Sequence, residues 1–83
     1  MRIKNYTVVL QKEPEGGYTA VVPSLPGCVT YGESIEEAED LVKDAIEIYV
    51  ASLIKHGDGV PEERNVFLTS VSVQNPSISF SHA

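Results

Sequence analysis

The chain has 83 residues, a net charge of −6 and an apolar content of 42%. This length supports one domain with a modest core, and the apolar content argues against a disordered chain. The acidic balance disfavours a general nucleic-acid-binding protein, because phosphate contacts need Lys and Arg. The apolar runs are too short to span a membrane, and no signal-peptide pattern opens the sequence. Together with the lone cysteine, Cys28, they indicate a cytoplasmic protein.

The first third of the sequence predicts an antiparallel meander of three strands. Apolar and polar residues alternate at the start, with Tyr6, Val8 and Leu10 on one face of the first strand. Pro23 ends the second strand, because proline has no N–H to donate to a ladder. Loops rich in proline and glycine separate the strands. The predicted strands are residues 3–11, 18–22 and 28–31.

A long amphipathic helix is predicted next, over residues 34–56. Ser34 as N-cap and Glu37 three residues later form a capping box, and Gly57 stands where a C′ residue belongs. Apolar residues at i, i+3 and i+4 spacing make one stripe along the helix. These residues are Ala38, Leu41, Val42, Ala45, Ile46, Tyr49, Leu53 and Ile54.

The end of this helix favours self-association. A 23-residue helix is roughly 34 Å long, whereas a seven-residue strand spans about 23 Å, so the helix overhangs the sheet. Either the C-terminal segment or another subunit covers its last two turns. We therefore expect a homodimer or higher homo-oligomer. The expected interface consists of Val50, Leu53, Ile54, Ile78 and Phe80.

Residues 66–74 predict a fourth strand, which Pro76 stops. A right-handed crossover through the helix would make this strand parallel to the first. The order β-β-β-α-β predicts a two-layer α+β fold, with a mixed four-stranded sheet and one helix on one face. Residues 77–80 alternate again, as a tail or an edge strand that pairs with a second chain. We therefore expect a domain over residues 1–75 and a tail or short edge strand over 76–83.

Several stretches carry a resemblance to a known family. They are Y-T-V-V-L at 6–10, E-G-G-Y-T-A-V-V-P at 15–23, L-P-G-C-V-T-Y-G-E-S at 25–34, E-E-A at 36–38 and A-I-E-I-Y at 45–49. In these stretches the sequence resembles the HicB-like antitoxin family, in its short, stand-alone form. The resemblance implies a partial RNase H-like fold with strand order 3-2-1-4.

The resemblance also implies a partner, the small HicA toxin, an mRNA-cleaving ribonuclease with a catalytic histidine. The antitoxin would bind this toxin and keep the histidine from RNA. Many members of the family add a C-terminal helix-turn-helix or ribbon-helix-helix unit that binds DNA. Only about ten residues follow the predicted fourth strand here. We therefore do not expect this chain to bind DNA directly.

An acidic stretch at residues 36–47 is the main candidate for partner recognition. Six acidic side chains stand against Lys43, a charge of −5. Two interpretations stay open. The stretch is a surface that binds a basic partner, or it is a solvent-exposed helix face whose acidic residues near the N-terminus interact favourably with the helix dipole. The expected partner-binding residues are Tyr18, Tyr31, Glu36, Glu39, Asp40 and Glu47.

The residue pattern argues against catalysis by this chain. A two-metal nuclease needs acids that converge from strands and helix, and the predicted strand interiors contain none. We expect Cys28 to be an inert, buried thiol, and we expect no cofactor, metal or catalytic residue. Two main hypotheses remain. The chain is an antitoxin that sequesters a small basic ribonuclease, or a stand-alone homo-oligomeric accessory protein without a toxin. A third hypothesis is a vestigial nuclease, which would require that this chain cleaves RNA in a metal-dependent reaction.

Overall fold

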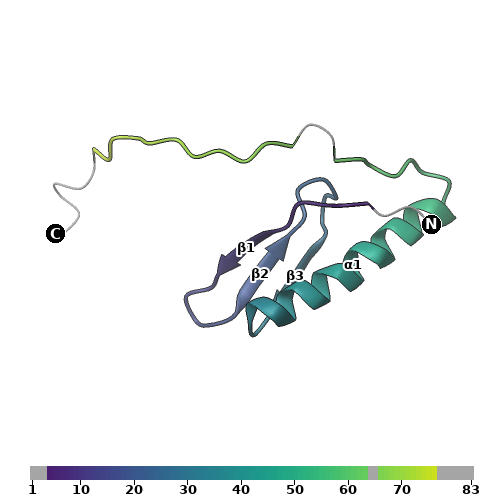
Figure 1. The fold of residues 1–83 in the computed structure, drawn as a ribbon, viewed down its shortest axis with the longest axis horizontal. Helices are drawn as coiled ribbons and strands as arrows, with labels where there is room; N and C mark the ends of the chain where they lie inside the picture. Colours follow the sequence, from purple (N-terminus) through teal and green to yellow (C-terminus); the bar gives the residue numbers. More distant parts are fainter. Residues whose placement is uncertain (1–3, 64–65, 77–83) are drawn as a thin grey trace.

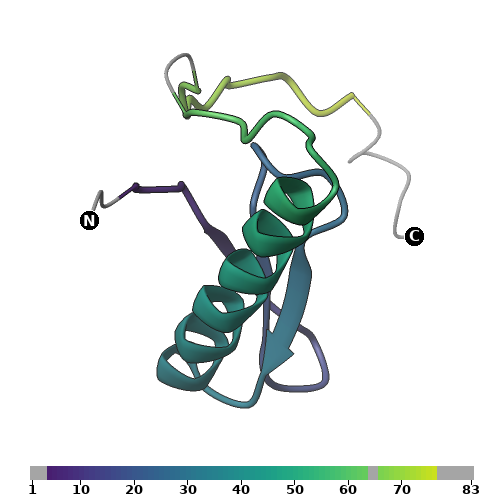
Figure 2. The same ribbon diagram turned by 90° about the vertical axis from the view of Figure 1, so that its right-hand side faces the viewer.

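The computed structural model describes residues 4–63 and 66–76, and shows a three-stranded antiparallel sheet with one helix across one face (Figures 1 and 2). The sheet has the order β1-β2-β3. The α+β class and the antiparallel meander are therefore confirmed. The elements are β1 (Val9–Lys12), β2 (Tyr18–Val21), β3 (Val29–Gly32) and α1 (Ile35–Lys55).

The first strand starts later than the alternation predicts, at Val9 rather than at residue 3. In the register that pairs Val9 with Val21, Thr7 would stand opposite Pro23. Proline has no N–H, so the ladder cannot continue past this point. The N–H of Thr7 donates instead to the Glu63 carboxylate, at 2.6 and 2.8 Å from its two oxygens. Residues 4–8 therefore continue the path of β1 without being part of the sheet.

Both ends of α1 are capped, close to the predicted positions. The Ser34 hydroxyl accepts from the N–H of Glu37 at 3.1 Å, which confirms the N-cap. The Glu37 carboxylate reaches back to the N–H of Glu33, one residue before the cap. At the other end, Gly57 has φ 75° and Asp58 N–H donates to the Leu53 carbonyl. This is a Schellman motif, which favours glycine because its φ is positive.

The core lies between the sheet and the first half of α1. Among the described residues, six apolar side chains are buried, namely Ala20, Val22, Leu25, Cys28, Ala38 and Val42. Leu25 enters this core from the turn between β2 and β3, where its N–H donates to the Val22 carbonyl. The helix also docks on that turn through Tyr49, whose hydroxyl donates to the Pro26 carbonyl at 2.8 Å. This short turn therefore holds the sheet and the helix together.

The predicted fourth strand is not confirmed. Residues 66–75 have no strand assignment, and their side chains are exposed. The segment runs away from the sheet and helix (Figure 1). The radius of gyration is accordingly 16.9 Å, against about 12 Å for a compact chain of this length. The four-stranded mixed sheet and the RNase H-like architecture are thus not confirmed either, and the predicted edge strand at 77–80 lies outside the described residues.

Candidate partner-binding site

An open apolar groove of about 1070 Å³ lies between the chain that leads into β1 and one side of α1. It exists because α1 packs mainly against β3 and β2, and so leaves the helix-facing side of β1 only half-buried. Its apolar walls are Tyr6, Val8 and Leu10 on one side and Val42, Ile46, Val50 and Ile54 on the other. Its polar rim includes Lys4, Glu39, Lys43 and Glu47. A segment with apolar side chains at its centre and polar side chains at its edges would therefore be complementary to this groove.

The strand side of this groove follows from the register of the sheet. Leu10 pairs with Ala20, and Ala20 is completely buried beneath the helix. Side chains alternate between the two faces of a strand. Leu10 and Val8 therefore face α1, while Val9 faces the uncovered side of the sheet. This confirms the face that the sequence predicted for Tyr6, Val8 and Leu10, all of which pack against the core.

The outer edge of β1 has free hydrogen-bonding capacity. The N–H of Glu13 donates to the carbonyl of Gly17 across the hairpin. Opposed pairs in an antiparallel ladder alternate between bonded and non-bonded, so Gln11 and Val9 also bond to β2. The backbone groups of Leu10 and Lys12 consequently point away from β2. Within the described residues, no strand pairs with this edge.

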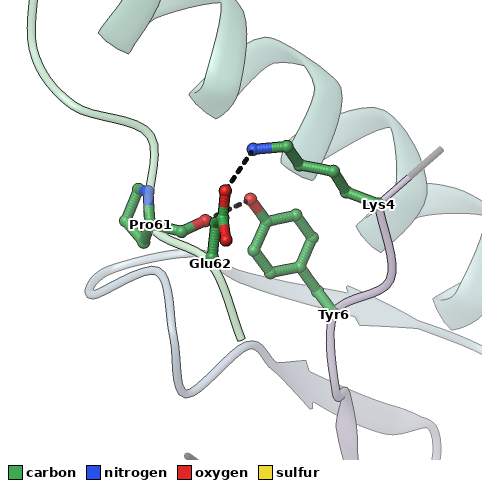
Figure 3. Close-up of polar contacts among 4 residues, drawn as sticks. All are labelled: Lys4, Tyr6, Pro61 and Glu62. Atoms are coloured by element: carbon green, nitrogen blue, oxygen red, sulfur yellow. Dashed lines mark hydrogen bonds and ion pairs between the residues drawn. The ribbon is translucent and has the colours of Figure 1, made fainter. Parts of the chain in front are cut away.

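The chain that follows the helix is anchored beside this groove. The Tyr6 hydroxyl donates to the Pro61 carbonyl at 2.8 Å, and Lys4 Nζ lies 3.9 Å from a Glu62 carboxylate oxygen (Figure 3). Burial of the phenol, and then the charges of Glu62 and Glu63, raise the pKa of Tyr6. These contacts fix residues 61–63 against the segment that leads into β1, and none of the three lines the groove.

Glu63 is the most connected carboxylate of this anchor. It accepts hydrogen bonds from the N–H and the hydroxyl of Thr7, and from the Ser24 hydroxyl at 3.1 Å. The bonds from the Thr7 hydroxyl and N–H, aided by Ser24, hold the pKa of the Glu63 carboxyl below its ordinary value of 4.5. A charged Glu63 thus links the chain after α1 to the ends of both β1 and β2.

Acid is therefore expected to loosen this anchor. A carboxyl with a lowered folded-state pKa stabilises the fold above its unfolded-state pKa, and this contribution is lost as the pH falls through the lowered value. Stability measured by urea unfolding should decline below about pH 4.5 in the wild type. The decline should be shallower in Glu63→Gln. Glu15→Gln, in the exposed hairpin loop, should keep the wild-type profile, and identical acid profiles for all three chains would contradict the assignment.

The acidic residues of α1 lie on its exposed side. Glu36, Asp40 and Asp44 follow one another at i+4 spacing, and all three are exposed. Glu39 and Glu47 lie nearer the groove and line its rim, together with Lys43. Lys43 Nζ is 3.9 Å from a Glu47 carboxylate oxygen. Within the described residues, no basic side chain forms an ion pair with Glu36, Asp40 or Asp44. We call these three residues the acidic row.

The two tyrosines expected to bind a partner lie on opposite faces of the sheet. Tyr18 packs against the core on the helix side. Tyr31 lies on the uncovered face, where it is 47% exposed and its hydroxyl donates to the Gly16 carbonyl at 2.9 Å. Val29, two residues before Tyr31, is exposed on the same face. The structure therefore groups Tyr31 with this uncovered face rather than with Tyr18 or the helix acids.

The residues expected at an oligomer interface are only partly brought together. Val50 and Ile54 line the groove, and Ile54 is largely exposed. Leu53 is half-buried and does not line the groove. Ile78 and Phe80 lie outside the described residues. The helix end thus offers an apolar surface, but in the groove rather than along its whole last turn.

Sequence reasoning missed the exposure of the most exposed apolar segment among the described residues. Residues 66–74, which we call the C-terminal arm, were expected to be a paired strand. In the structure Phe67, Val71 and Val73 are 83%, 78% and 81% exposed, and Leu68 is also exposed. Monomeric proteins rarely leave contiguous apolar surface of this kind open to water. The mixed apolar pattern on both faces of this segment was the available signal.

The described residues offer little for metal or thiol chemistry. In residues 4–63 and 66–76, no three His, Cys, Asp or Glu side chains come together in a way that could hold a metal ion. Cys28 is buried, and burial raises the pKa of its thiol. Less thiolate makes it a weak nucleophile. No helix in this part of the chain is long and apolar enough to cross a membrane.

Comparison with known proteins identifies the class of protein. The model of the HicB-like antitoxin of bacterial toxin–antitoxin systems matches residues 6–77. The match begins in the segment that leads into β1 and covers the sheet, the helix and the arm. The chain therefore belongs to the HicB-like antitoxin family.

Individual relatives agree with this placement. A UPF0150 protein of Synechocystis sp. is 48% identical over 62 residues, which cover 75% of this chain and 78% of the relative. A UPF0150 protein of Thermoplasma acidophilum is 43% identical over 58 residues, 70% of this chain and 84% of the relative. A UPF0150 protein of Thermotoga maritima is 31% identical over 72 residues, 86% of this chain and 92% of the relative.

Proposed function

We propose that this chain is the antitoxin of a toxin–antitoxin pair, acting without catalysis in the cytoplasm. Its partner would be a small, basic, HicA-like ribonuclease, which it would bind so as to keep RNA from the active site. Family membership supports a toxin–antitoxin role. The observation that carries the choice of a basic partner is the acidic row, Glu36, Asp40 and Asp44, exposed and without ion-pair partners among the described residues.

The mechanism is competition for the same positive charges. A ribonuclease holds the phosphates of RNA with Lys and Arg side chains. Carboxylates on one rigid helix can contact those cations in place of the phosphates. Charge complementarity of this kind mainly accelerates association and sets specificity, and salt weakens it. The uncovered face of the sheet around Tyr31 and Val29 would add apolar contact, because aromatic residues are enriched at the centres of interfaces.

Neutralising the acidic row should slow binding to the toxin. The triple variant Glu36→Gln, Asp40→Asn, Asp44→Asn is expected to associate about tenfold more slowly at low salt, and the difference should shrink at high salt. Stopped-flow or biosensor kinetics with a purified HicA-like toxin would measure the rates. An RNA-cleavage assay would measure inhibition.

A control with equal charge isolates the effect of position. Glu15→Gln, Glu33→Gln and Asp58→Asn remove three exposed acids elsewhere, and this control should bind like the wild type. If both triple variants slow association equally, the acidic row has no special role. If the unaltered chain forms no complex with any HicA-like toxin of its own cells and does not restore growth when such a toxin is expressed, the antitoxin proposal fails.

The second candidate is a stand-alone homo-oligomeric accessory protein. The exposed apolar arm favours it, because such a segment needs a cover. A pull-down of the tagged chain from its own cells separates the two candidates. Recovery of a small basic protein at near 1:1 ratio supports the antitoxin, whereas recovery of this chain alone supports the accessory protein.

A further inference from the structure

We infer that two copies of this chain join their sheets through the outer edges of β3, antiparallel to each other and with Thr30 of one copy opposite Thr30 of the other. The two sheets then form one continuous sheet, and the two helices lie side by side on the same face of it. The edge of β1 and the groove beside it take no part in this contact. This inference concerns the chain alone and does not rest on the antitoxin role.

The outer edge of β3 has free backbone groups, as the hydrogen bonds on its inner side show. The N–H of Val22 donates to the carbonyl of Cys28 at 3.1 Å. Bonded and non-bonded pairs alternate in an antiparallel ladder, so Thr30 also bonds to β2, whereas the backbone groups of Val29 and Tyr31 point away from it. Among the described residues, no strand pairs with this edge. It lies at the end of the sheet nearest α1 (Figure 1).

The residues on either side of β3 select the register of a symmetric pair. Before the strand, Gly27 has φ 83°, which is not an extended conformation. After the strand, the N–H of Glu33 already donates to a carboxylate of α1. The free groups of Val29 and Tyr31 are all used when Val29 of each copy faces Tyr31 of the other. A two-fold axis requires this reciprocity, and it then passes between the two Thr30 residues.

The hydroxyl of Thr30 gives independent support for this register. Its oxygen is buried and has no hydrogen-bond partner among the described residues, which is an unfavourable state for a hydroxyl. In the paired edges the two Thr30 residues form a non-bonded pair, the kind whose side chains lie closest together. A rotation about χ1 lets one hydroxyl donate to the other, and such Thr–Thr hydrogen bonds stabilise cross-strand pairs.

The side chains on the uncovered face of the sheet are also complementary in this register. Val29 and Tyr31 are both exposed there. Each would pack against the other residue of the second copy, as an aromatic and β-branched pair across two strands. β3 contains no proline and no charged residue, which are common means of preventing the pairing of sheet edges. The edge is therefore apolar and open to a second copy.

On the helix side, α1 presents an uncharged strip to the second copy. Tyr49 contacts the turn between β2 and β3, and the next residue, Val50, lines the groove on the β1 side. Successive helical residues are rotated by about 100°, so Ile48, the residue before Tyr49, lies on the opposite side, toward the outer edge of β3. Ile48 is 71% exposed, and Ala45 and Ser52 share its side at i−3 and i+4 spacing.

The spacing of the strands brings the two helices within packing distance. α1 lies over β3 and β2, and neighbouring strands are about 4.8 Å apart. Two sheets joined at β3 would therefore hold their helices roughly 10 Å apart, which is within the range of packed helices. The exposed Ile48 side chains would then be covered in the dimer.

Sedimentation of the purified full chain gives the first test. The wild type is expected to be a dimer at micromolar concentration. Val29→Lys with Tyr31→Lys places like charges directly opposite each other in this register, whereas Val29→Lys with Tyr31→Glu places opposite charges there. Both variants lose the same two side chains. The like-charge variant should have a dimer dissociation constant at least about tenfold higher than the opposite-charge variant. A monomeric wild type, or equal dissociation constants, would overturn the proposal.

Disulfide formation tests the position of the two-fold axis. The Cα atoms of a non-bonded pair are about 4.5 Å apart, within the range that a disulfide spans. Thr30→Cys should therefore give a covalent dimer when its thiols are oxidised with diamide, as a non-reducing gel would show. In the control Val29→Cys, the two cysteines would be about 8 Å apart, which is too far for a disulfide. The wild type, whose Cys28 is buried, is the blank.

The same gel gives the outcomes that would contradict the register. Equal amounts of covalent dimer from the two cysteine variants, or none from Thr30→Cys, would disprove the pairing. No toxin is present in either test, so these failures leave the proposed function untouched.

Discussion

Replacing Leu25 by alanine is expected to unfold a large part of the population at 25 °C. Leu25 is 0% exposed and is one of the two largest side chains buried completely. A Leu→Ala change at such a site costs about 2–5 kcal/mol. A core of this size rarely supplies more than about 3–5 kcal/mol in total. The loss is therefore comparable to the whole stability, and urea unfolding followed by circular dichroism would show it.

A second leucine provides the control. Leu41 lies on α1 and is 42% exposed, and alanine favours a helix at least as well as leucine does. Leu41→Ala should therefore lower stability far less than Leu25→Ala. Equal losses in the two variants would mean that the turn between β2 and β3 does not hold the core. A neutral Leu25→Ala would contradict the packing described here.

Gly32→Val should produce the second large loss, for a different reason. A Cβ at Gly32 would lie 2.4 Å from the backbone nitrogen of Ala38 and 2.7 Å from its Cα. Backbone atoms cannot rotate away as a flexible side chain can, so the helix would have to move off β3. Overpacking of this kind costs about 1–3 kcal/mol and sometimes more. Thermal unfolding of the variant should show a clearly lower midpoint.

Gly59→Val is the matched control for this clash. Nothing lies within 4 Å of the position that its Cβ would take, and its φ is not positive. This variant should unfold at nearly the wild-type temperature. A loss as large as that of Gly32→Val would point to a general cost of removing glycine. A harmless Gly32→Val would show that the start of α1 does not rest on β3.

Short sequence motifs were sufficient to predict the elements that depend only on neighbouring residues. The helix has its N-cap at Ser34 and its C′ glycine at Gly57, because caps depend on a few neighbouring residues. The meander follows in the same way from hairpin loops and from Pro23. The point at which a strand ends depends also on residues of the neighbouring strand. The late start of β1 depends on Pro23 of the opposite strand, which only the register brings level with Thr7.

Other features depend on contacts between distant parts of the chain. The alternation of residues 66–74 indicates an extended segment, but it does not specify which edge that segment meets. The anchoring of Glu63 by Thr7 and Ser24 joins positions far apart in the sequence. The expectation for Tyr18 and Tyr31 named both residues without their faces, and the register separates them. Recognition of the family came from motif residues, which identify a class without defining its contacts.

The residues that form the core are synthesised before the C-terminal arm. The buried apolar side chains of the described residues lie between Ala20 and Val42, and α1 ends at Lys55. Synthesis runs from the N-terminus, so residues 66–74 are made after all of these side chains and after α1. Every residue that forms the core is therefore already in the chain before the arm is made.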